Sequence, residues 1–305
     1  MAERPVSPES TAGAGTFFEL RVGAIVLSRM IRGGVVPVGP QLGISEAGFQ
    51  QRNAGYKLDD IVIHSQPRDG ETAAPVTQVQ VKKNLALTAG NEAFSQFIDA
   101  SVRAYRDCPE EFENGHRLLC LAAEESSDKL LEFRQLCERA RGTGEANSLQ
   151  CQIQPNALGK AQRDVYGHVR SAIGAASGSS NESVIDRLTY QILASMHVWA
   201  VAPWDDGRDW RNELDLIGAI ASDAGVPSAD MLGKLRDLSE SFAKNGGKVA
   251  SAHVQRRLRS DHGLTIKLTS QRPESRAPKF IANQYGSGTM NNAVDQTNHF
   301  HLPPQ

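Results

Sequence analysis

The spacing of apolar residues predicts a long helix followed by several short strands. Residues 17–32 are apolar at helical spacing and on nearly every side, which is typical of a buried helix, and Gly33 is suited to end it. Shorter stretches follow, in which β-branched residues are frequent and turn residues lie between them. They predict an edge strand at 35–38, where its proline is tolerated, and strands at 59–64 and 76–83.

The pattern then returns to helical spacing and alternates between helices and strands. The elements predicted are a helix over 91–106, an interior strand over 117–123, a helix from Ser126 or Ser127 to about Arg141, and a last strand over 149–153. Strands interleaved with helices bury a central sheet between helical layers. The sequence therefore predicts an α/β fold with a mixed sheet flanked by helices.

From about residue 156 the pattern is mostly helical. Helices are expected over 182–202, 209–224 and 228–244, with a flexible linker at 174–180 and a helix followed by a short strand within 250–268. The predicted organisation has four parts: a disordered N-terminus at 1–15, an α/β domain at 16–155, a mainly helical region at 156–270 with an oligomerisation or regulatory role, and a flexible tail at 271–305.

Polar groups in the two strands suggest chemistry. Gln80 and Lys82 are two residues apart in a strand and so project from the same face. Asp60 opens the preceding strand and can lie opposite them if the two strands form a hairpin. A carboxylate and an amide oxygen suit a hard divalent cation, and a lysine can polarise an attacking water. Considered alone, an acid-or-amide-x-Lys triplet is a weak signal.

The wider pattern "GYKLDDIVI … VTQVQVKK … AFSQFIDA … RLLCLAA" resembles the Mrr-like branch of the PD-(D/E)xK restriction-endonuclease superfamily. It is most similar to the double-stranded-DNA endonuclease domain of bacterial antiphage effectors, which occurs in CBASS systems and with STAND-type NTPases. The likeness covers residues 16–155 and, more loosely, the helical continuation. It implies a restriction-endonuclease-like fold.

The resemblance also implies roles for individual residues. Asp60 corresponds to the metal-binding aspartate, Lys82 to the catalytic lysine, and Gln80 to a position usually held by Asp or Glu. Glu19 matches a glutamate on the first helix and can add a carboxylate. The cofactor implied is Mg²⁺ or Mn²⁺, held by Asp60 and Gln80. Because glutamine carries no charge, cation affinity should be lower than at a site with two carboxylates.

Structural interpretations compete with these roles. Asp59 can replace Asp60 as the ligand, or both can cap the strand. Lys82 can be a surface lysine, and Glu19 can interact with the dipole of its helix. Lys83 faces the other side of its strand and is expected to be structural or to contact a phosphate. The segment from Trp204 to Trp210 is expected to be an aromatic turn in the core.

Charge and cysteine content limit the class of protein. The net charge of −2 is unremarkable, but residues 231–280 carry eleven Lys or Arg against four Asp or Glu, which fits either a phosphate-binding track or a solvated helical face. The four cysteines show no metal-binding spacing and are expected to be buried thiols. With no signal peptide or membrane-spanning stretch in view, the expected location is the cytoplasm.

The C-terminal stretch 283–300 is rich in Gly, Asn and Gln. It resembles short motifs through which some bacterial immune proteins assemble in an amyloid-like way, although a plain disordered tail has the same composition. The tail is therefore a candidate contact for a sensor protein of an NTPase or nucleotide-signal system.

The function expected from the sequence is a metal-dependent endonuclease that degrades double-stranded DNA with low sequence specificity. It would act as an effector of bacterial antiphage defence, activated by homo-oligomerisation or by a partner sensor. The alternatives are a nuclease-fold adaptor with little turnover, which recruits partners through its helical half and tail, and an RNase on the same fold.

Overall fold

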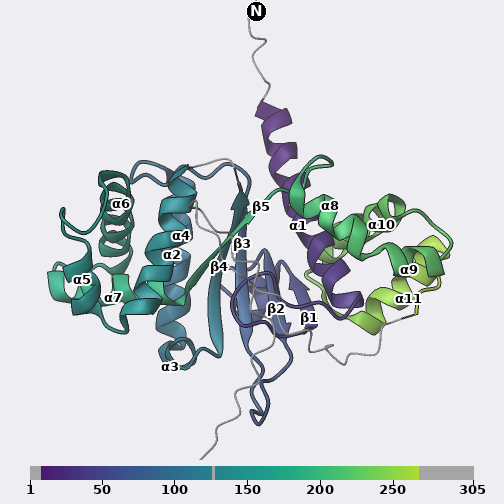
Figure 1. The fold of residues 1–305 in the computed structure, drawn as a ribbon, viewed down its shortest axis with the longest axis horizontal. Coiled ribbons are helices and arrows are strands. Elements are labelled where there is room, and N and C mark those ends of the chain that lie inside the picture. The colour runs from purple at the N-terminus through teal and green to yellow at the C-terminus, as the bar shows by residue number, and fades with distance from the viewer. Residues whose placement is uncertain (1–7, 126–127, 268–305) are drawn as a thin grey trace, which may run out of the picture. The chain divides into compact units, whose positions relative to one another are not determined.

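A six-stranded mixed sheet forms the centre of the protein. The computed structural model describes residues 8–125 and 128–267, and its strands lie in the order β5-β4-β3-β2-β1-β6 (Figure 1). The pairs β1–β2, β2–β3 and β1–β6 are antiparallel, whereas β3–β4 and β4–β5 are parallel. The strands are β1 Ile44–Phe49, β2 Ile61–Ser65, β3 Val76–Lys82, β4 Arg117–Glu124, β5 Met196–Val201 and β6 Lys248–Ala250. The predicted mixed α/β fold is confirmed.

Helices cover both faces of this sheet (Figure 1). One face packs against α1 Pro8–Ile31, α8 Arg208–Leu216, α9 Gly218–Asp223, α10 Ser228–Asn245 and α11 Ser251–His262. The other packs against α2 Glu92–Asp107, α3 Pro109–Glu113, α4 Asp128–Thr143, α5 Ala146–Gln152, α6 Lys160–Ser177 and α7 Glu182–Ser195. A 3₁₀ turn, η1 Gln51–Ala54, follows β1.

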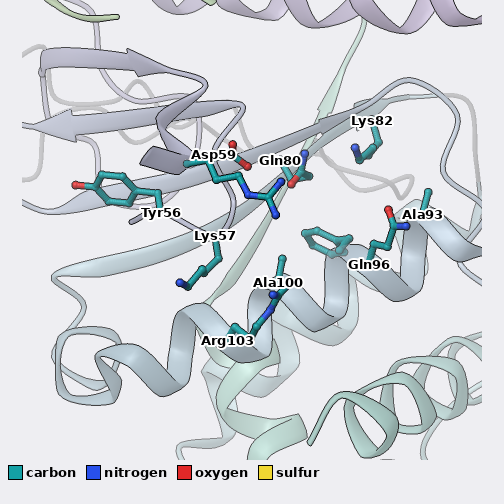
Figure 2. A pocket seen from close by; sticks show the side chains of 11 residues that line it. Tyr56, Lys57, Asp59, Gln80, Lys82, Ala93, Gln96, Ala100 and Arg103 are labelled. Atoms are coloured by element: carbon teal, nitrogen blue, oxygen red, sulfur yellow. The ribbon is translucent and has the colours of Figure 1, made fainter. Parts of the chain in front are cut away.

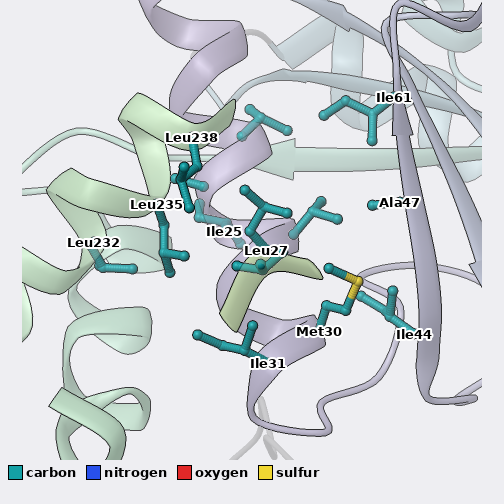
Figure 3. Close-up of a cluster of buried hydrophobic side chains, with 14 of the residues drawn as sticks. Ile25, Leu27, Met30, Ile31, Ile44, Ala47, Ile61, Leu232, Leu235 and Leu238 are labelled. Atoms are coloured by element: carbon teal, nitrogen blue, oxygen red, sulfur yellow. The ribbon is translucent and has the colours of Figure 1, made fainter. Parts of the chain in front are cut away.

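The core on the α1 face determines which way the polar residues of β3 point. Val79 and Val81 belong to the apolar cluster that α1 and α10 build, part of which is drawn in Figure 3. Because side chains alternate along a strand, Gln80 and Lys82 must face the side covered by α2. The burial of the two valines therefore orients the polar pair.

Helix α1 is fixed at its C-terminal half by a buried carboxylate. Glu213 of α8 accepts hydrogen bonds from Ser28 Oγ at 2.9 Å and from Arg29 Nε at 2.9 Å, and Arg32 Nη2 lies 3.1 Å from its Oε1. The helix ends at Ile31, and Gly33, predicted to end it, has a φ of 71°. The Gly34 N–H bonds to the Arg29 carbonyl at 2.7 Å, which is the 6→1 bond of a Schellman motif.

The N-terminal prediction is wrong in part. Residues 8–15, expected to be disordered, are helical and form the first turns of α1. Extending a helix from a segment that is already packed requires no new nucleation, so its polar start can remain helical. Residues 1–7 lie outside the described residues, as do the predicted cap at Ser126 or Ser127 and the whole tail from residue 268.

Strand prediction failed where the local β propensity of a segment does not match its place in the sheet. The segment Ile44–Phe49, for which no strand was predicted, is β1, and its central Glu46-Ala47-Gly48 has little β propensity. The expected edge strand at 35–38 makes only a single bridge, from Val35 to Gly43. The expected strand at 149–153 falls mostly in helix α5. Long-range pairing, which the local pattern does not encode, decides these cases.

The region 156–270 is mainly helical but also contributes to the sheet. Residues 196–202 were assigned to a helix, and β5 occupies most of that range. The predicted linker at 174–180 is helical through Ser177, and residues 263–267 form no strand. Because β5 and β6 pair with strands from the first half, no break between separate sheets occurs at residue 155, and the described residues belong to one compact unit.

Candidate active site

Asp60 and Gln80 meet where β2 begins. Ile61 is paired with Val79, so Asp60, one residue earlier, lies opposite Gln80. The Gln80 side-chain amide donates a hydrogen bond to Asp60 Oδ2, and the Val81 backbone N–H donates to the same oxygen at 2.8 Å. The structure thus brings together two of the residues that sequence reasoning selected.

A cavity of about 590 Å³ adjoins this pair, between the sheet and α2 (Figure 2). Gln80 and Lys82 reach it from β3, as expected for residues on one face of a strand. The acid in its wall is Asp59, whereas Asp60 lies against Gln80. Both aspartates that the sequence offered as alternatives are therefore at the site. The complete lining is Arg52, Tyr56, Lys57, Asp59, Gln80, Lys82, Ala93, Gln96, Phe97, Ala100 and Arg103.

Glu19 of α1 belongs to the same electrostatic group. Its Oε1 accepts a hydrogen bond from Gln50 Nε2 at 2.7 Å. Burial, reinforced by the negative charge of Asp60, raises the pKa of Glu19 to about 7, while the Gln50 hydrogen bond and the charge of Lys82 act in the opposite direction. Glu19 is therefore close enough to Asp60 and Lys82 for their charges to influence its protonation.

The two aspartates are also held under conditions that disfavour their charge. Burial raises the pKa of Asp59, and the charge of Arg52 opposes that shift. Burial likewise raises the pKa of Asp60, and the hydrogen bond from Val81 and the charge of Lys82 oppose it. A cation beside a partly buried carboxyl group of this kind would stabilise its charged form.

The donor atoms suit a hard divalent cation. Asp60 offers a carboxylate. Gln80 now directs its Nε2 toward Asp60, and rotation of its terminal amide by 180° would direct Oε1 there instead. Oxygen donors of this kind match Mg²⁺ and Mn²⁺. Over residues 8–125 and 128–267 there is no group of three or more His, Cys, Asp or Glu side chains that could hold a metal ion. A site here would consequently depend on the amide.

Cations in the cavity wall were missed by the sequence analysis. Arg52, Lys57 and Arg103 join Lys82 in the lining. Two of them are also in ion pairs, Lys57 with Asp107 at 3.2 Å and Arg103 with Asp99 at 2.7 Å. The available signal was the helical spacing of α2, which places Gln96, Ala100 and Arg103 along one stripe. Such a wall can hold anionic groups such as phosphates.

Lys83 and the Trp204–Trp210 segment lie apart from this cavity. The Lys83 ammonium stands 4.9 Å from the centroid of the Trp204 ring, whose Nε1 donates to Glu124 Oε1 at 2.5 Å. Trp210 is buried and packs under the guanidinium of Arg21 at 4.2 Å. The two tryptophans thus pack within and against the core.

The predicted basic track contributes nothing to the cavity lining within its described part, residues 231–267. Several of its cations pair with nearby acids instead, including Lys248 with Glu46 at 2.5 Å and Arg257 with Asp261 at 2.6 Å. Two of the four cysteines, Cys120 and Cys137, are buried as expected, whereas Cys151 is exposed.

Comparison of the chain with protein-family models, with curated proteins and with solved structures found no match. In the part of the chain that the structure describes, none of the helices combines the length and apolar character needed to cross a membrane.

Proposed function

We propose that this protein is a metal-dependent endonuclease that cleaves double-stranded DNA with little sequence preference. The observation that carries the proposal is the contact of Asp60 with Gln80 beside a cavity whose wall holds Lys82 and further cations. The resemblance of the sequence to the Mrr-like PD-(D/E)xK nucleases supports the same assignment.

In this proposal Asp60 and Gln80 hold Mg²⁺ or Mn²⁺, and Glu19 adds a carboxylate beside them. A bound cation would supply charge neutralisation at the scissile phosphate and a lower pKa for an attacking water. Lys82 contributes a fixed positive charge that orients this water and stabilises the charge developing on the phosphate. The water oxygen would form a bond to phosphorus and give up a proton to solvent, while one ester P–O bond breaks and its electron pair leaves with the sugar oxygen, which takes a proton from solvent.

The remaining cations of the wall have a separate task. Arg52, Lys57 and Arg103 line the cavity with positive charge and are suited to backbone phosphates, which carry no sequence information. This favours low sequence specificity. As an effector of bacterial antiphage defence, the enzyme would be controlled by self-assembly or by a partner sensor, and the 156–270 region and the C-terminal tail are the candidate contacts.

The experiment that tests this proposal is incubation of the purified full chain with supercoiled plasmid and Mg²⁺ or Mn²⁺. We expect cleavage that EDTA stops and that Lys82→Ala lowers by at least about 100-fold. Lys83→Ala is the matched control, because this neighbouring lysine packs over Trp204 and lies outside the cavity lining; it should cleave as the wild type does.

Two outcomes would replace the proposal. Absence of cleavage with either cation, over a range of protein concentrations that includes assembled protein, would favour the adaptor with little turnover. Cleavage of labelled RNA but not of plasmid would favour an RNase. Equal loss of activity in the Lys82 and Lys83 variants would remove the special role assigned to Lys82.

A further inference from the structure

Gln50 has an unusual backbone conformation at the edge of the candidate site. Among the described residues it is the non-glycine residue with a positive φ, with φ 50° and ψ 54°. A side chain is unfavourable in this left-handed region, and such residues persist where surrounding contacts hold them in place. The contacts of Gln50 therefore need an explanation.

Backbone hydrogen bonds connect the turn at Gln50 and Gln51 to both Asp59 and Asp60. The Gln50 N–H bonds to the Asp60 carbonyl at 3.2 Å, and the Gln51 N–H bonds to the Asp59 carbonyl at 2.9 Å. The Gln51 side chain in turn donates to the carbonyl of Gly246 at 2.8 Å. The turn is thus fixed between the start of β2 on one side and the α10–β6 connection on the other.

The side chain of Gln50 reaches a different element. Its Nε2 donates to Glu19 Oε1 at 2.7 Å, and Glu19 lies on α1. One residue therefore bonds to the main chain of Asp60 and to the side chain of Glu19. The carboxylates of Glu19 and Asp60 repel each other when both are charged. The neutral amide of Gln50, whose own main chain is bonded to that of Asp60, can hold the Glu19 carboxylate in place against this repulsion.

We propose that Gln50 is a positioning residue that holds the Glu19 carboxylate beside Asp60, so that Glu19, Asp60 and Gln80 can share one divalent cation. The proposal rests on the proposed function, since it assumes a cation at Asp60. Its basis is the geometry of the turn: the left-handed backbone directs the main chain to Asp60 while the side chain extends to α1. Without the amide, Glu19 is free to turn away from Asp60.

Gln50→Gly tests this with little risk to the fold, because glycine adopts the left-handed conformation readily. The probe is Mn²⁺ alone, titrated into the full chain and followed by the electron paramagnetic resonance of the free ion. We expect Gln50→Gly to weaken Mn²⁺ binding by about tenfold, the lower range for loss of a partner that orients a ligand. Gln154→Gly, in an exposed turn away from the cavity lining, is the control and should bind as the wild type does.

A double-mutant cycle separates positioning from a general loosening of the site. If Gln50 acts through Glu19, Gln50→Gly should change Mn²⁺ affinity less than twofold when Glu19→Gln is already present. An equal loss in both backgrounds would overturn the proposal, as would unchanged affinity in the single variant. If the wild type itself binds no Mn²⁺, the cation site of the proposed function fails and this inference fails with it. If the wild type binds and only the Gln50 result is negative, the inference alone fails.

Discussion

The side-chain amide of Gln80 donates a hydrogen bond to the carboxylate of Asp60, across the start of the β2–β3 pair. In this arrangement the Gln80 amide nitrogen occupies the position beside the Asp60 carboxylate where a cation bound by both residues would lie. Cation binding would therefore require the amide to turn, and the hydrogen bond competes with the metal. This relationship gives the glutamine two roles, as a structural partner without metal and as a ligand with it.

Gln80→Glu should separate those two roles. Without cation, the new carboxylate loses the hydrogen bond and repels Asp60, so the free energy of unfolding should fall by about 1–3 kcal/mol. With saturating Mn²⁺, two carboxylates bind the ion more strongly than a carboxylate and an amide, so the loss should be recovered or exceeded. Thermal unfolding with EDTA and with Mn²⁺ measures both effects.

The quantity to compare between the wild type and each variant is the increase in the thermal unfolding midpoint that Mn²⁺ produces. Gln78→Glu is unsuitable as a control, because Gln78 is buried and accepts from the Lys57 N–H at 3.2 Å. Gln96→Glu, on the exposed side of α2, adds the same charge elsewhere in the cavity. A similar Mn²⁺ effect in both variants would show that the charge acts through the general field of the cavity and not as a ligand at position 80.

The protonation of Glu19 should make stability depend on pH. Burial raises its pKa from 4.5 to about 7, so the folded state binds this proton more tightly than the unfolded state does. The resulting stabilisation is fully present below pH 4.5 and is lost as pH rises through about 7. In EDTA, the unfolding free energy of the wild type relative to Glu19→Gln should thus fall by roughly 2 kcal/mol across this window, a figure reduced for partial exposure.

Denaturant unfolding of both proteins at several pH values between 4 and 8 measures this difference. The difference between the two curves reports on the titration of Glu19 together with its interaction with Asp60. Parallel curves would show that Glu19 titrates near its ordinary value and lies outside the influence of Asp60.

Arg52 and Arg103 should bind DNA phosphates through the wall of the cavity. Each arginine removed should lower affinity for duplex DNA and reduce the slope of log K against log salt by about one. Binding is measured by fluorescence anisotropy without divalent cation, so that no cleavage occurs. Arg134→Ala on α4, which removes an exposed pair with Glu138 at 3.6 Å, is the charge-matched control. An equal effect in the control would assign the loss to overall charge.

The extent to which the site could be predicted depended on which contacts are local. Gln80 and Lys82 share a face because they are two residues apart on one strand, and Asp60 meets Gln80 through a hairpin; all three follow from local pattern and a short connection. Gln50 could not be found in this way. Its importance comes from a left-handed φ and from bonds to Glu19 and Asp60, neither of which has a signature in the sequence around it.

The same distinction explains the fold. The α2 and α10 helices were predicted nearly to their ends because their periodicity is local, whereas for α1 only the apolar part from residue 17 onward was predicted. The β5 strand was not, because its apolar residues directly follow those of α7 and no Gly or Pro separates them. Its strand conformation depends on pairing with β4, which lies more than seventy residues earlier in the chain.

Gly23 should be essential to the approach of α1 to α10, which positions the helix that carries Glu19. A Cβ added at Gly23 would lie only 2.1 Å from Ser239 Oγ of α10 and 3.0 Å from Phe49 Cε1. Gly23→Ala should therefore lower the free energy of unfolding by about 1–3 kcal/mol, as overpacking of a tight core does. Chemical denaturation measures the change.

Two further variants distinguish overpacking from helix propensity. Gly167→Ala lies within α6, where an added Cβ meets nothing within 4 Å, and it should raise stability by about 0.5–1 kcal/mol because alanine favours helix. Adding Ser239→Ala to Gly23→Ala removes the oxygen that makes the closest contact, leaving Ser239 Cβ at 3.1 Å, and should recover part of the loss. If Gly23→Ala proved as stabilising as Gly167→Ala, α1 and α10 would have room to move apart, and the position of Glu19 would not depend on their close approach.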